Sequence, residues 1–598
     1  MTFRPKPPLA ALPALLLALL AGCSDPAPSR TALEDAEISL DRGNGHAAEK
    51  TLRTALEAGG TLPEYAAYLG EAAMLQGDLA KARQYLGPGK FSADTAAYGY
   101  KQLGRLELKT GNLPAAGAAF DKALRIAPQD AGLWVDIGRL RYRGGEQVQA
   151  LAAARRALEY DPDDAEALLF RGQLARDAEG AGAALALFSQ ALEQHPDNIE
   201  ILSELAATLG DVGRTGEALD IIRRIAVIAP DAPRLHYLQA VIAARAGNSD
   251  LARSLLQRAS GEEQGRPAGR MLAGILEMEA GNFATAAQIL LQLNDRQPDN
   301  PQVRRLLVRA LSQSGAEREL IARFGAEAAR PWASPYLKSA VGRAYEAMDR
   351  REEAAPLLDA ASRSVGLTLA PLPSSLPREI LETIREDGGL VSRDRVRDSI
   401  RPGETATAVS EASVMARRFP GSADMLSLLG DAQLADGDAQ AASETYGRAA
   451  QVRQGWSLTK RLMAAHIAAG RREDANALLR AYLLAGSTNS EASHLYARVL
   501  GEKGDWLRAK ALLESALDYG AWRDPGAIAL LSEAELRLSN PGAAREHAWL
   551  AYKLQPMNPV TVAALMRATD DEELRARMRK KLNALTRVAG DSDRADAA

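Results

Sequence analysis

The chain has 598 residues, of which 46% are hydrophobic but only 5% aromatic, and its formal net charge is −4. A nearly neutral chain argues against a dedicated nucleic-acid binder, because such proteins are strongly basic. The apolar fraction contains few large rings and much alanine, which favours helix pairs packed through small residues. We therefore expect an all-α protein without a nucleic-acid partner.

Residues 1–22 are predicted to be a signal peptide. Arg4 and Lys6 precede the short apolar run Leu9–Leu20, which is not long enough to span a bilayer comfortably. The run ends in Leu-Ala-Gly before Cys23, and this arrangement resembles the bacterial lipoprotein signal. The resemblance implies cleavage before Cys23 and a diacylglyceryl thioether on its sulfur. The alternative is an ordinary signal peptide that happens to contain a cysteine.

Cys23 is the chain's one cysteine, so it has no disulfide partner within the chain. Each buried methylene of an acyl chain contributes about 0.8 kcal/mol, so two or three chains anchor a protein stably. In lipoprotein sorting, aspartate directly after the cysteine favours the inner membrane. That position is Ser24, so the resemblance implies the outer membrane, facing the periplasm; Asp25 keeps the inner membrane as the alternative. Residues 23–28 contain two prolines and are predicted to be a short, stiff tether.

Residues 29–364 carry a period of 34 residues. Glycine recurs at this step, at Gly43, Gly77, Gly111, Gly145, Gly213, Gly247, Gly281 and Gly315. Alanine recurs five residues later, at Ala48, Ala82, Ala116, Ala150, Ala184, Ala218, Ala252 and Ala286. The pattern predicts two helices per unit, with the glycine ending the first in a left-handed conformation and the alanine letting the second approach it. Prolines such as Pro128 and Pro162 close the units, because proline cannot continue a helix.

Further residues resemble one known repeat. They are Trp134 near the start of a unit and the glycines Gly104, Gly138 and Gly172. Together with the period, the alanine ladder and the closing prolines, they resemble the tetratricopeptide repeat. The resemblance implies an all-α, right-handed superhelical solenoid of about 15 helix–turn–helix repeats. This fold serves many partners, so it implies no single function.

The 34-residue register is lost after residue 364. Residues 365–388 are rich in proline, serine and leucine and are predicted to be an insertion, with an elbow, a hinge and a docking loop as the alternatives. Repeats return in residues 389–556. Residues 557–589 are predicted to be capping helices that cover the last apolar face, and residues 590–598 a disordered tail.

We expect no catalytic site, no metal and no cofactor. The chain has six histidines, none with a second histidine three or four residues away, and no His-Glu-x-x-His motif. No Gly-x-Ser-x-Gly motif or phosphate loop lies between a predicted strand and a helix. The segments outside the repeats are too short to enclose an active site, so we predict that the protein is not an enzyme.

The resemblance also implies a binding groove, since the first helix of each tetratricopeptide unit lines the concave face. The family's contact positions fall here on Tyr98, Lys101, Arg105, Lys109, Arg139, Tyr142, Arg143, Arg176, Arg234, Tyr237 and Arg245. Most of these side chains are basic or aromatic and would suit an anionic partner, either an acidic peptide segment or an acidic polysaccharide. The alternative is that they form an ordinary solvated helix face.

The function predicted from these features is a non-catalytic, lipid-anchored periplasmic scaffold for protein–protein interactions in an envelope assembly or export machine. A lipoprotein signal followed directly by many repeats resembles the tetratricopeptide lipoproteins of exopolysaccharide export and exosortase (PEP-CTERM) systems. The expected partners are envelope proteins, together with the membrane through the anchor. Three alternatives remain: direct binding of an anionic polysaccharide, regulation of a cell-wall enzyme, and a pilotin-like role in a pilus or secretion system.

Overall fold

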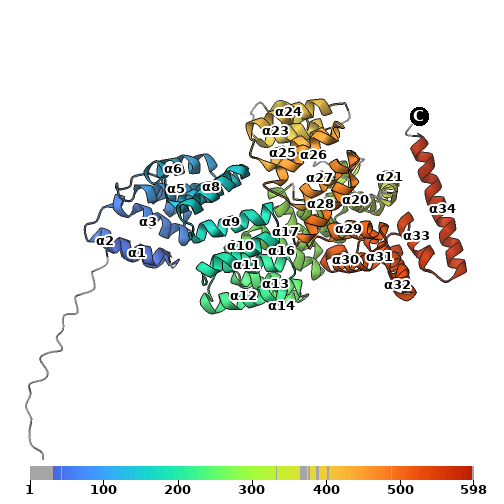
Figure 1. Cartoon of the computed structure of the whole chain (residues 1–598), viewed down its shortest axis with the longest axis horizontal. Coiled ribbons are helices and arrows are strands. Elements are labelled where there is room, and N and C mark those ends of the chain that lie inside the picture. Colours follow the sequence, from blue (N-terminus) through green and yellow to red (C-terminus); the bar gives the residue numbers. More distant parts are fainter. Residues whose placement is uncertain are drawn as a thin grey trace, which may run out of the picture. The chain divides into compact units, whose positions relative to one another are not determined.

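The computed structural model describes residues 31–595, except residues 42, 299, 331–332, 364–373, 375–377, 385–388, 401–402 and 487. The predicted signal peptide, Cys23 and the tether therefore lie outside the described residues, as does most of the predicted insertion at 365–388. Throughout the described part, every regular element is a helix (Figure 1). The prediction of an all-α fold is confirmed.

The helices follow one another along the chain in pairs. The first fourteen are α1 (Ala32–Asp41), α2 (Gly45–Glu57), α3 (Leu62–Leu75), α4 (Leu79–Leu86), α5 (Ala96–Thr110), α6 (Leu113–Ile126), α7 (Ala131–Arg143), α8 (Gln147–Tyr160), α9 (Ala165–Ala178), α10 (Ala181–Gln194), α11 (Ile199–Asp211), α12 (Thr215–Ile228), α13 (Leu235–Arg245) and α14 (Ser249–Arg258). After the short α15 (Gly261–Gly265) come α16 (Pro267–Glu279), α17 (Phe283–Arg296), α18 (Pro301–Gln313), α19 (Glu317–Ala328), α20 (Pro335–Ala347) and α21 (Arg351–Arg363).

The remaining helices belong to the predicted insertion, which contains α22, to the second predicted block and to the C-terminus. They are α22 (Arg378–Thr383), α23 (Gly389–Ser399), α24 (Thr405–Arg418), α25 (Ala423–Ala435), α26 (Ala439–Ala450), α27 (Trp456–Ala468), α28 (Arg472–Leu484), α29 (Ser490–Glu502), α30 (Trp506–Ala516), the π-helical turn η1 (Leu517–Ala521), α31 (Pro525–Arg537), α32 (Pro541–Leu554), α33 (Pro559–Ala568) and α34 (Glu572–Ala595). The chain divides into two compact units, residues 1–136 and residues 137–598, with the boundary inside α7. Each unit is described by itself below.

The two small-residue ladders have the roles that their spacing predicts. Gly111 follows α5 with φ of +86°, and the next residue, Asn112, accepts a hydrogen bond from the Ala115 amide at the start of α6. The ladder alanines are buried, and Ala150 has no exposed surface. One step differs from the pattern. Position 179 is Glu179, and the left-handed residue is the following Gly180, at φ of +99°, because Glu179 keeps a right-handed conformation as the cap of α9.

A second set of glycines lets the two helices of one repeat touch through a large ring. A Cβ atom added at Gly104 in α5 would lie 2.2 Å from the Phe120 ring of α6. Gly172 in α9 and Phe188 in α10 repeat this contact, at 2.3 Å. Phe120 and Phe188 are almost completely buried. The glycine and the ring therefore form a complementary pair that sets how closely the helices of a repeat approach.

Within the second unit, turns far apart in the sequence lie against each other. The Ala423 amide donates to Gln147 Oε1 at 3.1 Å, the Gln454 amide to the Asp177 carbonyl at 2.7 Å, and Thr488 Oγ1 to the Asp211 carbonyl at 3.0 Å. In each bond, the donor and acceptor residues are 276 or 277 positions apart in the sequence. That separation is about eight lengths of the 34-residue repeat.

We call this set of contacts the seam, formed by residues 145–148, 177–182 and 211–213 against residues 421–423, 454, 485, 486, 488 and 519. Small residues permit it. A Cβ atom at Gly180 would lie 2.9 Å from Ala485 Cβ, and one at Gly213 would lie 2.2 Å from the Tyr519 hydroxyl. Successive turns of the later repeats therefore contact successive turns of the earlier repeats in the same order.

The last helices pack against each other at the C-terminus. Leu574 and Met578 of α34 are buried in one apolar cluster with Val562 and Leu565 of α33. The helix α34 continues to Ala595, past the predicted start of the tail at residue 590. No helix in the described part of the chain has both the length and the apolar character needed to cross a bilayer.

Candidate partner-binding face

In the first unit, α5 brings the four predicted residues Tyr98, Lys101, Arg105 and Lys109 to one side, because they recur every three or four positions. The Tyr98 ring stacks on Tyr68, with the ring centroids 4.8 Å apart. Lys101 Nζ lies 3.1 Å from Asp130, and Arg105 Nε donates to Asp136 Oδ2 at 2.6 Å. Lys109 is exposed at the end of the helix.

Burial shapes the electrostatics around Tyr98. Its hydroxyl donates to the Glu71 carboxylate, and burial together with that carboxylate raises the tyrosine pKa well above its usual range. Burial also raises the pKa of Glu71, although the Tyr98 hydroxyl and the Arg105 charge oppose it. Asp136 is buried at the end of this row, with Arg105 as its ionic partner. Tyr98, Lys101 and Arg105 are thus held by carboxylates of the neighbouring repeats.

In the second unit, α7 and α9 hold the next predicted residues in the same way. Arg139 Nη1 lies 3.0 Å from Glu166 of α9. The Tyr142 hydroxyl donates to Asp177 of α9, and burial and that carboxylate raise the tyrosine pKa. Arg143 lies exposed in the last turn of α7. Each paired side chain therefore reaches from one repeat to the next.

Glu204 of α11 joins three successive repeats. It accepts a hydrogen bond from Arg176 of α9 and another from Arg234, the residue that caps α13, each at 2.7 Å. The carboxylate side chain is only 9% exposed. Burial alone would raise its pKa, but the charges and hydrogen bonds of Arg176 and Arg234 outweigh burial and lower it.

The remaining predicted residues lie on α13. Arg245 Nη2 is 2.8 Å from Asp211, which belongs to the last turn of α11. Tyr237 is partly buried, and burial raises the pKa of its hydroxyl although Arg234 and Arg245 oppose this effect. The predicted Arg245 of α13 therefore pairs with a carboxylate of α11 that was not predicted.

Two carboxylates on this face, Asp136 and Glu204, were not predicted from the sequence. Asp136 and Glu204 are two steps of 34 residues apart, so the repeat period could have identified them as equivalent. Their presence makes the face a mixture of guanidinium and carboxylate groups. The preference for an anionic partner stays a prediction.

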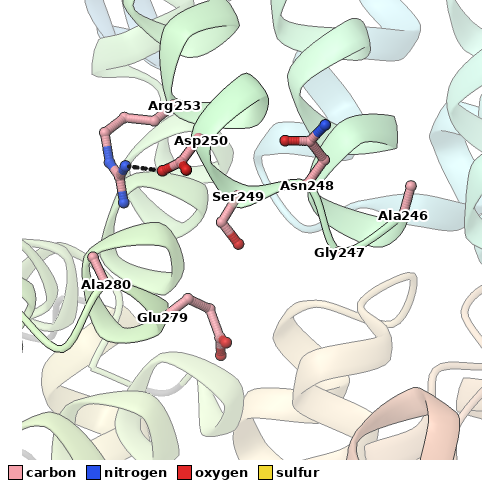
Figure 2. A pocket seen from close by; sticks show the side chains of 8 residues that line it. All are labelled: Ala246, Gly247, Asn248, Ser249, Asp250, Arg253, Glu279 and Ala280. Atoms are coloured by element: carbon pink, nitrogen blue, oxygen red, sulfur yellow. Dashed lines mark hydrogen bonds and ion pairs between the residues drawn. The ribbon is translucent and has the colours of Figure 1, made fainter.

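A shallow hollow lies elsewhere, at the turns after α13 and α16 (Figure 2). It is lined by Ala246, Gly247, Asn248, Ser249, Asp250, Arg253, Glu279 and Ala280. Asn248 caps α14 through the Leu251 amide, and Asp250 pairs with Arg253 at 3.0 Å. No histidine or second basic group faces Ser249 in this lining. The hollow thus contains the ordinary polar groups of a helix start, without a nucleophile and base in contact.

Among the described residues, no group of three or more histidine, cysteine, aspartate or glutamate side chains is arranged to hold a metal ion. Cys23 lies outside that part of the chain.

Comparisons with known proteins bear on the repeats. Two family models, both described as tetratricopeptide repeat, match the chain; one matches residues 35–86 and 135–199, the other residues 175–242 and 243–310. No curated protein matches the chain.

Several solved structures match the chain at low sequence identity. The Cut9–Hcn1 hetero-tetramer of the APC/C is 15% identical, with 90% of this chain and 96% of that chain covered and a TM-score of 0.26. A human IFIT1 dimer with PPP-AAAA is 17% identical, over 64% and 90% of the chains, with a TM-score of 0.35. Pseudomonas aeruginosa pilF is 20% identical, over 36% and 96% of the chains, with a TM-score of 0.28.

The matched segments coincide with the helix pairs, the left-handed glycines and the buried alanines described above. The chain is an all-α repeat solenoid, and its residues 35–86 and 135–310 match the tetratricopeptide repeat.

Proposed function

We propose that this protein is a non-catalytic scaffold that is anchored by a lipid on Cys23, faces the periplasm from the outer membrane, and holds protein partners in an envelope assembly or export machine. Export of exopolysaccharide is the machine that the layout of the chain favours. Tetratricopeptide repeats support protein–protein interaction in general, and the rest of the proposal extends that role to a place in the cell.

The observation that carries the scaffold role is the row of cross-repeat contacts on the first helices. Arg139 with Glu166, Tyr142 with Asp177, and Arg176 and Arg234 with Glu204 fix long polar side chains that remain partly exposed. Side chains that are already ordered lose less conformational entropy when a partner binds. A face of this kind is suited to holding another protein in one orientation.

The anchor and the compartment rest on the sequence before residue 29. The basic start, the short apolar run and the Leu-Ala-Gly-Cys segment together support lipid attachment at Cys23. Ser24 in the position after the cysteine supports the outer membrane. Mass spectrometry of the N-terminal peptide tests the lipid directly, because lipidated Cys23 adds the mass of a diacylglyceryl group and an unmodified thiol would contradict the anchor.

The test of the scaffold role is crosslinking in living cells, followed by affinity purification and mass spectrometry. We expect a reproducible set of envelope proteins with the wild type and loss of that set with Cys23→Ala. The double variant R139E/R143E reverses two charges on the predicted face, and R156E/R223E reverses two on exposed outer positions as its matched control. Loss of partners in the first variant alone supports the face.

Two results would contradict the proposal. Recovery of no protein above the untagged background would exclude a stable scaffold. Co-purification of an anionic sugar polymer without protein would instead support direct glycan binding.

A further inference from the structure

A second surface, in the unit formed by residues 137–598, combines arginine and aromatic side chains from repeats that are far apart in the sequence. Arg305 and Arg309 lie four residues apart on α18 and therefore share one side of that helix. Tyr336 is the second residue of α20, which packs against α18. Trp522 and Arg523 lie between η1 and α31. The sequence analysis named none of these five residues.

The Trp522 ring is the centre of this surface. The Arg309 guanidinium lies over the ring at 5.4 Å from its centroid, and the Arg523 guanidinium at 5.2 Å. The local chain explains why the ring is presented there. Gly520, at φ of +117°, bends η1 in a way that a residue with a Cβ atom rarely adopts, and Trp522 follows that bend with 48% of its surface exposed.

The charges on this surface are not neutralised within the described part of the chain. Arg305, Arg309 and Arg523 form no ion pair there, in contrast to Arg304 beside them, which pairs with Glu327. The nearest carboxylate in the sequence, Asp524, accepts hydrogen bonds from the Gly526 and Ala527 amides and faces His494.

The surroundings of Tyr336 show the same excess of positive charge. The charges that act on its hydroxyl come from Arg309, Arg305 and Arg523, and all three oppose the rise in its pKa that burial causes. Among the described residues, no carboxylate contributes to this shift. Three cationic groups therefore converge on one exposed aromatic surface without an anion from the described part of the chain.

We propose that Arg305, Arg309, Arg523, Trp522 and Tyr336 form a site for an acidic segment of a protein partner. The inference rests on the proposed scaffold function, since it assigns a partner class to one surface of that scaffold. Guanidinium groups bind carboxylates through two parallel hydrogen bonds. The indole ring supports two of these groups and so fixes them before the partner arrives.

Spacing favours a peptide in an extended conformation. Side chains four residues apart on a helix are about 5–6 Å apart at Cβ. Alternate residues of an extended chain point the same way and are about 6.6 Å apart. Acidic residues at alternate positions of an extended segment would therefore match Arg305 and Arg309, and a third carboxylate would reach Arg523.

A polysaccharide fits this surface less well. Sugars that bind an aromatic residue stack on a free face of its ring, whereas two guanidinium groups already lie against Trp522. The geometry thus favours carboxylates that approach the arginines from their solvent side.

The test measures binding of a short fluorescein-labelled peptide of alternating glutamate and serine to the purified full-length protein in detergent. We expect binding that weakens as salt is added. Substitution R305A/R309A/R523A should weaken it by roughly a thousandfold, because each of the three charge-assisted contacts contributes about tenfold. R156A/R223A/R508A removes the same charge from exposed positions that have local ion pairs and should leave binding unchanged.

A second variant separates the aromatic support from the charges. Trp522→Ala keeps all three arginines but removes their platform, and we expect weaker binding that Trp522→Phe partly restores. A glutamine–serine peptide and an alginate oligosaccharide serve as the neutral and glycan probes. Equal binding of the acidic peptide to the wild type and the triple alanine variant would overturn the site, and binding of alginate in place of the peptide would overturn its ligand class.

The crosslinking experiment distinguishes this inference from the scaffold function. If envelope proteins are recovered by the wild type and by R305A/R309A/R523A alike, the site is wrong while the scaffold stands. If neither recovers any protein, the scaffold itself fails.

Discussion

Substitution Glu204→Gln tests whether one carboxylate couples three repeats. Glu204 accepts hydrogen bonds from Arg176 and Arg234, each at 2.7 Å, and it belongs to α11 between the two arginine-bearing segments. Glutamine keeps the shape of the side chain and removes its charge. The variant therefore leaves both guanidinium groups without their anion but creates no cavity.

The magnitude follows from the number of bonds and their exposure. A hydrogen bond to a charged group contributes about 1.5–3 kcal/mol, and two such bonds are weakened here. Each arginine side chain is 31% exposed, so water replaces part of what the carboxylate provided. We expect a loss of about 2 kcal/mol in local stability, which corresponds to roughly thirtyfold faster amide exchange.

The assay is hydrogen–deuterium exchange with mass spectrometry near neutral pH. Peptides from α9, α11 and the start of α13 should exchange faster, and peptides from α32 and α33 should not, because repeat arrays lose stability unit by unit. Glu217→Gln is the control, since Glu217 forms an exposed pair with Arg214. Unchanged exchange in α11, or equally faster exchange in α33, would refute the coupling.

The pH dependence gives an independent check on the same residue. The pKa of Glu204 in the folded protein is lowered from 4.5, so its contribution to stability is fully present above pH 4.5. The contribution is lost as the pH falls through the lowered pKa and the carboxylate takes up a proton. The difference in exchange between the wild type and Glu204→Gln should therefore close at low pH, and a difference that grows instead would contradict the sign.

Three further substitutions test the packing of single repeats. Gly104→Ala should lower the unfolding free energy of its repeat by about 1–3 kcal/mol, because the new Cβ would press on Phe120, whereas Gly216→Ala in open space should cost nothing measurable; thermal denaturation compares them. Gly111→Ala should cost about 1–2 kcal/mol through its left-handed backbone alone, and Gly111→Asn less, as urea titration would show. Ala150→Trp should speed hydrogen exchange in its own and adjacent repeats, and acceleration along the whole chain would contradict a repeat array.

The sequence predicted those features that recur within one repeat. Gly111 and Ala150 could be assigned because each position has the same backbone or packing requirement in every unit, so the requirement appears as a ladder. The contact positions on α5, α7 and α9 came from the resemblance to the tetratricopeptide repeat, and they stay a prediction. Their carboxylate partners were less visible, since Asp136 and Glu204 recur at only some of the steps.

Other features depend on distances that the repeat period does not contain. The contact between Thr488 and Asp211 depends on the rotation that accumulates over many repeats, and no local pattern records that sum. The approach of Trp522 to Arg309 also depends on this accumulated rotation, because the two residues belong to repeats that are far apart in the sequence. The lipid on Cys23 stays a prediction from the sequence alone.

The seam restricts which insertions and deletions the repeat array can accept. Its partners are separated by a near-multiple of the repeat length, so duplication or loss of one whole unit between residues 214 and 420 would shift each turn to the next equivalent turn. A change of any other length would place helices where small turn residues such as Gly180 and Ala485 now meet. Relatives of this protein should therefore differ in this interval by whole units, and their length differences should cluster near multiples of 34 residues.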